Sequence, residues 1–311
     1  MNVRWGLDAL PELLGERPFL VASDRWTHLV DAPASWSEIP SHRIEVPQGS
    51  DSIVAIGGGS AIDTAKAASA ASGLPLVSVP TTYSGAEWTV FFGVRDPDRR
   101  LQGGGSGAHP TGIVYEPELT LELPKAETVG TALNALAHCA EALYVDGHNS
   151  EADVEALAGA QLIARWLPQV VERPREREAR TELLRGACHA GAALGKSFLA
   201  LGHAMAQALG GRYGLPHGAM NALALPPALR FNAEAAPAAV ARFGAALESD
   251  DPAQRVEELA RLGGFERLRD FGVPEEDLHE LAGTVVERAG AKANPRRASA
   301  ADVEKLLRSI W

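Results

Sequence analysis

The chain has 311 residues, of which 46% are hydrophobic and 22% charged, and it carries a formal net charge of −11. This length accommodates two domains with a sizeable core, and the composition is ordinary for a soluble globular protein. The negative charge argues against nucleic acid or an anionic membrane as a partner, because both attract clustered Lys and Arg.

The two cysteines, Cys139 and Cys188, lie in apolar helical patterns rather than in a CxxC pair. We therefore expect free thiols, which suit a reducing compartment. The N-terminal stretch has no apolar signal core, and no apolar run approaches the length needed to span a bilayer. These features predict a cytoplasmic protein without a membrane segment.

Short apolar runs alternate with helical ones in the first part of the chain. We predict a helix over residues 61–72, closed by Gly73, and strands over 19–23, 43–46, 52–56 and 76–79. Between Asp24 and Ser50 there is room for at most one short helix besides the strand over 43–46. Strands that alternate with helices imply a mainly parallel α/β sheet.

From about Glu127 the chain becomes rich in Ala and Leu, with apolar residues at helical spacing and no convincing strand. The predicted helices cover 131–145, 151–167, 175–194, 199–209, 217–230, 237–247, 252–262, 274–288 and 300–310. We interpret the charged run over 172–180 as a solvated helix face. The sequence therefore predicts an α/β domain over 1–127 and an all-α domain over 128–311, with a binding cleft between them.

A glycine turn joins the strand over 52–56 to the following helix. It consists of Gly57, Gly58, Gly59 and Ser60. Free backbone N–H groups at the positive end of a helix dipole can bind a phosphate, and the missing side chains allow close approach.

Two neighbouring strands of the same sheet also end in polar residues. Thr81 and Thr82 follow the strand over 76–79, and Asp24 follows the strand over 19–23. The carboxyl ends of parallel strands meet at one edge, where α/β sheets bind ligands. Asp24 either accepts the hydroxyls of an adenosine ribose, which would repel a 2′-phosphate, or simply caps a helix.

Three histidines lie in apolar helical segments of the second part. His138 belongs to the helix over 131–145, and His203 and His217 lie on either side of a glycine-rich turn. Taken singly, each could be a satisfied core histidine. Together they indicate a site.

Five segments resemble the iron-containing alcohol dehydrogenase superfamily, and the likeness is strongest to its maleylacetate reductase branch. They are GGGSAIDTAK (57–66), PTTYSGAEWT (80–89), EPELTLELP (116–124), LNALAHCAEALY (133–144) and GHAMAQALGGRYGLPHGAMNALALP (202–226). They occur in family order along nearly the whole chain. The resemblance implies the dehydroquinate synthase-like fold, with a nucleotide-binding α/β domain, an all-α domain and the active site between them.

The resemblance also implies NADH as the cofactor, with NADPH as an alternative. The pyrophosphate would lie on the glycine turn, with Asp63 near it, and Thr81 and Thr82 would contact the cofactor from the next strand. Asp24 would hold the adenosine ribose and favour NADH.

In metal-dependent members of the superfamily, an Asp, a His four residues later and two further His fourteen residues apart hold the ion. The matching positions here are Asn134, His138, His203 and His217. An amide oxygen is a much weaker ligand than a carboxylate, and Gln207 stands where many metal-dependent relatives have another His. We therefore expect no tightly bound metal, as in the maleylacetate reductases, which carry the same Asn.

Without a metal, imidazole groups would stabilise or protonate the oxygen on which negative charge develops during hydride transfer. The catalytic candidates are His138, His203, His217, Asn134 and Tyr83. The expected substrate is a small unsaturated oxo-acid or a related oxo compound, whose carboxylates need cationic partners. Candidates for that role are Arg95, Arg99, Arg100 and His109, and the glycine-rich run over 103–107 leaves the substrate open.

Two alternatives remain open at this point. The chain could be a metal-dependent alcohol dehydrogenase with a weakly held Fe or Zn ion. It could also be a diverged non-redox cyclase, lyase or binding protein, because the segment from Asp24 to Ser50 is short for a parallel crossover. By analogy with the family we expect a homodimer.

Overall fold

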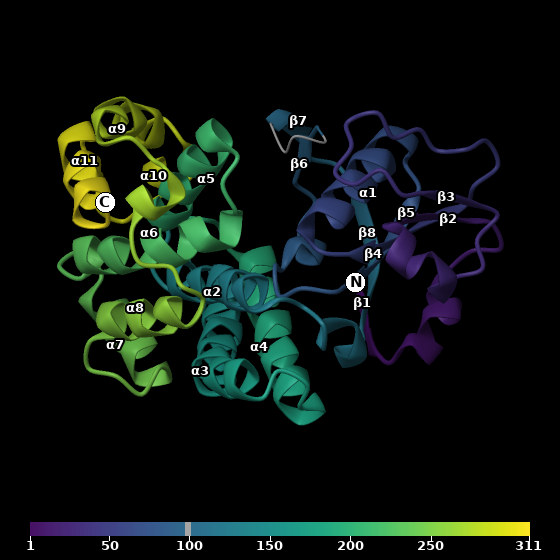
Figure 1. Cartoon of the computed structure of the whole chain (residues 1–311), viewed down its shortest axis with the longest axis horizontal. Helices are drawn as coiled ribbons and strands as arrows, with labels where there is room; N and C mark the ends of the chain where they lie inside the picture. The colour runs from purple at the N-terminus through teal and green to yellow at the C-terminus, as the bar shows by residue number, and fades with distance from the viewer. Residues whose placement is uncertain (97–100) are drawn as a thin grey trace. The chain divides into compact units, whose positions relative to one another are not determined.

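The computed structural model describes residues 1–96 and 101–311. They form two compact units, Met1–Thr120 and Leu121–Trp311 (Figure 1). The first unit contains a parallel sheet and the second is helical, which confirms the predicted fold class. Within the described ranges, no helix is both long and apolar enough to cross a membrane.

A six-stranded sheet organises the first unit, with strand order β1-β8-β5-β4-β2-β3 and every pair parallel. Its strands are β1 (Asn2–Trp5), β2 (Pro18–Ala22), β3 (Ala34–Trp36), β4 (Ser52–Gly57), β5 (Pro75–Pro80) and β8 (His109–Tyr115). The strands β2 and β4 are buried along their whole length, as expected where both faces of a parallel sheet are covered.

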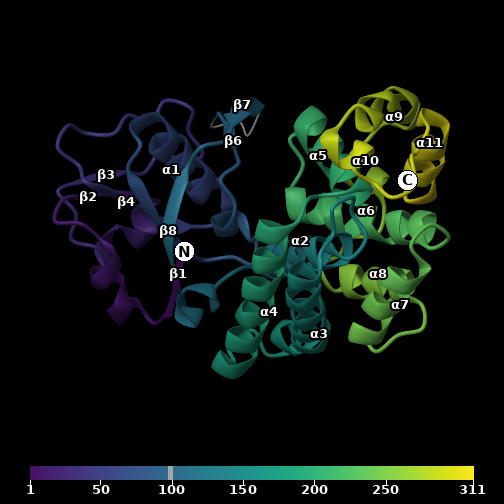
Figure 2. The ribbon, with the colours of Figure 1, turned by 180° about the vertical axis from the view of Figure 1, so that it is seen from behind.

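Different helices pack on the two faces of the sheet. Helix α1 (Gly59–Ser72) packs through Ile62, Ala65 and Ala68 on the face that presents Phe19 and Ile53. A 3-10 helix over Leu7–Leu13 and another over Asp24–Leu29 cover the opposite face. The back view in Figure 2 shows α1 beside β4 and β8. Gly73 ends α1 with φ 75°, a left-handed conformation that glycine adopts without strain.

The strand predicted over 43–46 is wrong. Those residues carry no strand pairing, and the edge strand β3 lies earlier, over Ala34–Trp36. Ile44 and Val46 instead pack as partly buried side chains against the core that contains Phe19 and Ile53. Their alternation therefore reflects an extended segment with one buried side rather than a ladder of hydrogen bonds.

Ten α-helices form the second unit within the described residues. They are α2 (Lys125–Ala142), α3 (Ser150–Glu172), α4 (Arg177–Lys196), α5 (Leu201–Tyr213), α6 (His217–Asn232), α7 (Pro237–Ala246), α8 (Pro252–Leu262), α9 (Leu278–Val286), α10 (Ala289–Lys292) and α11 (Ala300–Ser309). The predicted helices are present with shifted ends, except that the one over 274–288 divides into a 3-10 turn and α9, and α10 was not predicted.

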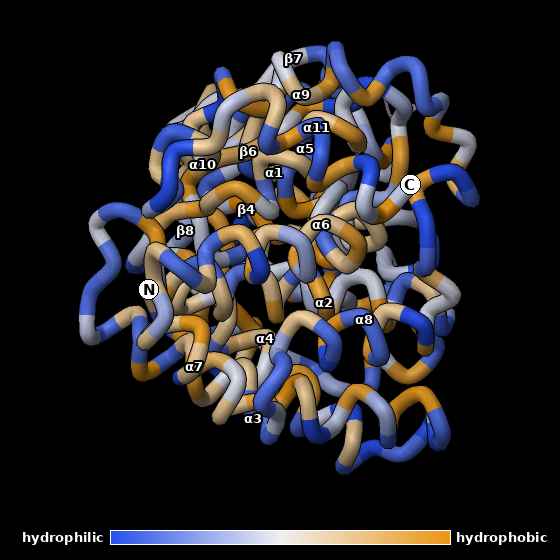
Figure 3. Tube along the Cα trace, turned by 90° about the vertical axis from the view of Figure 1, so that its left-hand side faces the viewer, coloured by the Kyte–Doolittle hydropathy of each residue, from blue (hydrophilic) through white to orange (hydrophobic). Residues whose placement is uncertain are grey.

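Helix α2 lies in the interior of this unit and packs against α3, α4 and α6. In Figure 3 the trace along α6 is mostly hydrophobic to neutral, and nearly all of its side chains are buried. Glycines permit close contact between these helices, because a Cβ on Gly159 of α3 would lie 2.9 Å from Cys139 Sγ and 3.0 Å from Gly186 O of α4.

The charged run over 172–180 is not a single solvated face. It spans the turn between α3 and α4, and its last residue, Arg180, is buried with 1% exposure. The guanidinium donates to Pro174 O at 2.8 Å, to Thr128 Oγ1 at 3.0 Å and to Leu123 O at 3.4 Å. A buried arginine with these partners fastens the start of α2 to α4.

Candidate active site

Three neighbouring strands of the sheet bring the predicted cofactor residues to one edge. Strand β4 pairs with β2 on one side, where Ala22 aligns with Ile56, and with β5 on the other, where Gly57 aligns with Pro80. Asp24, the glycine turn and Thr82 follow the carboxyl ends of these strands. This is the edge at which open α/β sheets bind ligands.

The glycine turn cannot accommodate side chains without displacement. Gly57 has φ 156°, and a Cβ there would lie 2.6 Å from Ala61 Cβ. A Cβ on Gly58 would lie 2.9 Å from Thr82 Cγ2. Gly58 is also the N-cap of α1 and has no side chain, so no side-chain cap accepts a hydrogen bond from the first N–H groups of the helix. The bare turn fits a pyrophosphate.

Two further groups at this edge are available to a cofactor. Thr82 Oγ1 is buried and has no hydrogen-bond partner among the described residues. Asp24 is exposed and lies in the first turn of a 3-10 helix whose N-cap is Ser23, so Asp24 does not occupy the capping position. A hydroxyl and a carboxylate in these places suit a phosphate-linked ribose.

Asp63 has a different set of contacts. Its Oδ2 accepts a hydrogen bond from Gly93 N at 3.2 Å, and its Oδ1 lies 3.7 Å from Lys66 Nζ. Lys66 is fully buried and donates to Thr89 Oγ1 and Phe91 O, both at 2.9 Å. Asp63 and Lys66 therefore anchor the hairpin of β6 (Phe92–Arg95) and β7 (Leu101–Gly105) to α1. Burial raises the pKa of the Asp63 carboxyl.

The remaining candidates of the first unit come from different segments of the chain. Tyr83 is fully buried, Arg95 is the last residue of β6, and His109 is the exposed first residue of β8. Arg99 and Arg100 lie outside the described residues.

The three predicted histidines come together within the helical unit. His138 belongs to α2, His203 to α5, and His217 is the first residue of α6. The ring centroids of His138 and His203 are 4.8 Å apart, and those of His203 and His217 are 6.0 Å apart. His203 and His138 are buried, whereas His217 is exposed. The cluster therefore reaches solvent through His217.

Sequence reasoning missed Glu141, which orients His203. The Glu141 carboxylate is fully buried and accepts from His203 Nδ1 at 2.7 Å, His203 N at 3.1 Å and Ala200 N at 2.6 Å. Gly202 allows this approach, because a Cβ there would lie 2.9 Å from Glu141 Oε1. The available signal was an acidic residue in an apolar helix, three residues after His138.

With Nδ1 bonded to Glu141, only the other ring nitrogen of His203 is left for a further contact. His203 Nε2 and His138 Nδ1 are both buried and have no hydrogen-bond partner among the described residues. Burial, together with repulsion from His203 and His217, holds the pKa of His138 well below its ordinary value. His138 is therefore neutral at neutral pH, and the cluster offers unpaired ring nitrogens to a polar ligand.

Asn221 was also missed, although it lies four residues after His217 on the same helix. Its Nδ2 donates to Asn134 Oδ1 at 2.7 Å and lies 3.0 Å from His217 Nε2. Asn221 is fully buried. This orientation of the amide is the one that gives each of its two hydrogens an acceptor.

The four positions that match the metal ligands of relatives do not fit a divalent ion as they are arranged. Asn134 supplies a neutral oxygen, and this oxygen and His217 Nε2 both face the Asn221 amide nitrogen. Within the described residues, no three His, Cys, Asp or Glu side chains are grouped to hold a metal.

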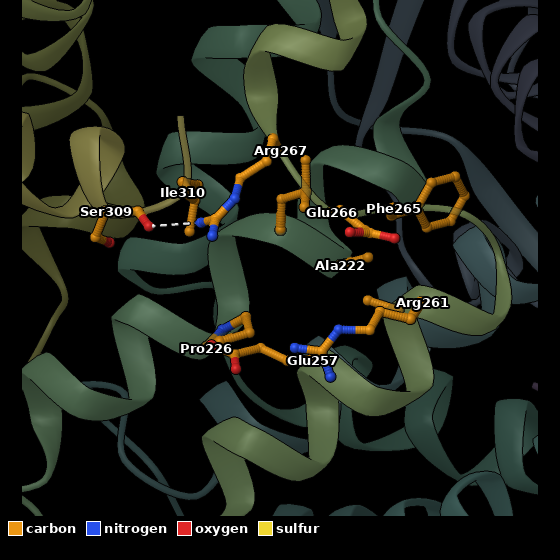
Figure 4. Close-up of a pocket in the computed structure, with 11 residues that line it drawn as sticks. Ala222, Pro226, Glu257, Arg261, Phe265, Glu266, Arg267, Ser309 and Ile310 are labelled. Carbon is orange, nitrogen blue, oxygen red and sulfur yellow. Dashed lines mark hydrogen bonds between the residues drawn. The ribbon is translucent and has the colours of Figure 1, made fainter.

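A pocket of about 180 Å³ lies elsewhere in the helical unit. Figure 4 shows lining residues from α6 (Ala222, Pro226) and from α8 (Glu257, Arg261) around it, together with Arg267. It contains none of the clustered histidines.

Comparison with known proteins assigns both units to the same family. Residues 45–117 match the family described as "Iron-containing alcohol dehydrogenase" and residues 128–311 match "Fe-containing alcohol dehydrogenase family, C-terminal". Maleylacetate reductase from Pseudomonas knackmussii is 36% identical over 260 residues, which cover 83% of this chain and 73% of that protein.

Two further relatives span the whole chain. Maleylacetate reductase 1 from Rhodococcus opacus is 34% identical over 311 residues, or 100% of this chain and 85% of that protein. The crystal structure of maleylacetate reductase from Agrobacterium tumefaciens superimposes with a TM-score of 0.87 at 26% identity, covering 100% of this chain and 95% of that one. The chain therefore belongs to the iron-containing alcohol dehydrogenase family and is an NAD(P)H-dependent oxidoreductase similar to the maleylacetate reductases.

Proposed function

We propose that this protein uses NADH to reduce a small unsaturated oxo-acid of the maleylacetate type, without a bound metal ion. The relatives named above support this substrate class. The observation that carries the proposal is the buried Glu141–His203 pair, which leaves His203 Nε2 without a protein partner.

When bound, NADH supplies the hydride that forms the new C–H bond on the substrate's C=C and is oxidised to NAD⁺. The bare turn at Gly58, Gly59 and Ser60 would hold its pyrophosphate, and Thr81 and Thr82 would contact it from the next strand. Asp24 would bind the ribose hydroxyls and disfavour NADPH, because a 2′-phosphate would meet a carboxylate.

The helical unit supplies the polar groups for the substrate. As hydride adds to one carbon of the C=C, its π electrons move through the conjugated system onto the carbonyl oxygen. His203 Nε2 stabilises that oxygen by a hydrogen bond and protonates it, and transfer of a proton from oxygen to the other carbon of the former double bond gives the saturated oxo-acid. The positive charge of the protonated ring is balanced by Glu141, whose carboxylate also accepts two backbone N–H groups.

The other residues of the histidine cluster surround His203. Neutral His138 stacks on His203, and Asn134 and His217 complete the wall around it. Arg95 is a candidate for the substrate carboxylates, because it is a cationic side chain. His109 does not suit this role, because it begins β8 beside Pro75, the first residue of β5, at the sheet edge opposite the glycine turn. Tyr83 remains a catalytic candidate from the family likeness.

The test is the consumption of NADH by chelator-treated protein in the presence of maleylacetate. We expect that the chelator leaves the turnover rate unchanged and that NADH is preferred over NADPH. A matched reaction with a saturated oxo-acid controls for simple carbonyl reduction. Loss of activity on metal removal, restored by Fe²⁺ or Zn²⁺, would instead favour a metal-dependent alcohol dehydrogenase.

We further propose a cytoplasmic homodimer. Neither Cys139 nor Cys188 forms a disulfide, which suits a reducing compartment, and pairing of helical units is an analogy with the family. Light scattering coupled to size exclusion measures the oligomeric state, and a monomer at micromolar concentration would contradict the dimer.

A further inference from the structure

We propose that the side-chain amide of Asn221 occupies the place of a metal ion in this site and thereby excludes divalent cations. The inference rests on the metal-free part of the proposed function. The Asn134 oxygen is a weak ligand and would by itself only lower the affinity for a metal ion. We therefore assign the exclusion of metal to the Asn221 amide.

The geometry that supports the exclusion is a bridge of two hydrogen bonds from one nitrogen. Asn221 Nδ2 lies 2.7 Å from Asn134 Oδ1 and 3.0 Å from His217 Nε2. A Zn²⁺ ion would need to lie about 2.0–2.2 Å from the same two atoms, along the same lone pairs. The amide and the ion therefore compete for one position between these ligands.

Displacing the amide is costly because Asn221 is fully buried. Its Oδ1 already has no partner among the described residues, and besides the two bridge contacts its Nδ2 has only a 3.4 Å contact with His217 O. Loss of the bridge would therefore leave the amide nearly unsatisfied. The neutral Asn134 oxygen binds a cation too weakly to compensate for this loss. The bridge also requires an unprotonated His217 Nε2, which fixes the proton of the neutral ring on Nδ1.

The experiment measures Zn²⁺ binding by isothermal titration calorimetry with chelator-stripped protein and needs no turnover. Four proteins are compared: wild type, Asn134→Asp, Asn134→Asp/Asn221→Ala and Asn134→Asp/Asn232→Ala. The first substitution restores the carboxylate, and the second also removes the amide. Asn232 is the matched control, because it is another fully buried asparagine on α6 and pairs with Asn294 instead.

We expect no stoichiometric Zn²⁺ on the wild type and weak binding to Asn134→Asp. Removal of Asn221 should tighten binding at least about tenfold over Asn134→Asp, which is the scale on which neighbouring groups tune metal affinity. The Asn232 control should match Asn134→Asp. Equal affinities of Asn134→Asp and Asn134→Asp/Asn221→Ala, or one Zn²⁺ per wild-type chain, would overturn the inference.

A second measurement on the wild type covers the case in which the double variant does not fold. Long-range ¹H–¹⁵N correlation spectra report the tautomer of each histidine. We expect His217 to carry its proton on Nδ1 and its signals to stay unchanged when Zn²⁺ is added. A proton on His217 Nε2 would rule out the bridge. Because neither readout uses NADH or substrate, a failed reductase assay and a failed exclusion remain distinguishable.

Discussion

Glu141 Oε2 lies 2.7 Å from His203 Nδ1, and neither side chain reaches solvent. A carboxylate in this position fixes the ring orientation and determines which nitrogen faces outward. Such carboxylate–histidine pairs recur where one ring nitrogen must be presented to a ligand. The pair connects α2 to the first turn of α5, since Glu141 also accepts from Ala200 N.

Glu141→Gln should therefore lower kcat about tenfold or more, because it removes the charge that supports a protonated His203 while keeping the volume of the side chain. KM should change less than kcat. The matched control is Glu155→Gln, because Glu155 accepts from His189 Nδ1 at the same 2.7 Å in a half-exposed position. Equal kinetics of Glu141→Gln and Glu155→Gln would show that the buried pair has no catalytic role.

Gly58→Ala should weaken NADH binding at least about tenfold, a cost of about 1.4 kcal/mol. The new Cβ would lie 2.9 Å from Thr82 Cγ2, so Thr82 must rotate and the turn becomes less open to a phosphate. Nicotinamide fluorescence measures the Kd. Gly283→Ala is the control, because its added Cβ would have no neighbour within 4 Å beyond the adjacent residues and the backbone of its own helix. An unchanged Kd for Gly58→Ala would place the pyrophosphate elsewhere.

Asp24→Asn should shift the preference between cofactors. Without the carboxylate, NADH loses an acceptor for its ribose hydroxyls and NADPH loses a repulsive charge. The ratio of the two Kd values should therefore move toward NADPH by about tenfold. Asp31→Asn, another exposed acidic residue of the same unit, controls for the change in net charge. Parallel loss of both affinities would mean that Asp24 acts only on the fold.

The lowered pKa of His138 predicts that the stability of the protein falls as the pH falls. Burial and the neighbouring His203 and His217 lower its pKa in the folded protein below the usual 6.5. Below about pH 6.5 the unfolded chain therefore binds a proton that the folded chain does not. This site should lower the free energy of unfolding by at most about 1.4 kcal/mol per pH unit as the pH falls.

Urea unfolding at about pH 7.5 and about pH 5.5 measures that slope. His138→Gln should flatten it, whereas substitution of the exposed His148 by Gln controls for the loss of a histidine elsewhere in the helical unit. An unchanged slope in His138→Gln would mean that His138 is already protonated or solvated in the folded state.

The fold was predictable where local signals are strong. Such signals mark β4, the turn at Gly57 and α1, which show an apolar strand run, consecutive glycines and an Ala-rich helical pattern ended by Gly73. Strand β8 was missed because its first half, His109 to Gly112, has no apolar pattern and gains its place from pairing with β5 and β1. Strand β3 is only three residues long and is defined by its neighbour β2.

The candidate site was predictable as a set of residue types but not as a network. Spacing and family likeness identified His138, His203 and His217. Glu141 and Asn221 were missed because a polar residue within an apolar helix pattern gives no indication of its partner. Their roles depend on contacts with residues 59 to 87 positions away, which only the packed helices define.

The most direct test of hydride transfer uses NADH deuterated at the transferable position, with maleylacetate as the substrate and chelator-treated protein. Mass spectrometry of the product should show the saturated oxo-acid with one deuterium on a carbon of the former double bond. NADH that binds but leaves every unsaturated oxo-acid unlabelled and unreduced would contradict the proposed reaction.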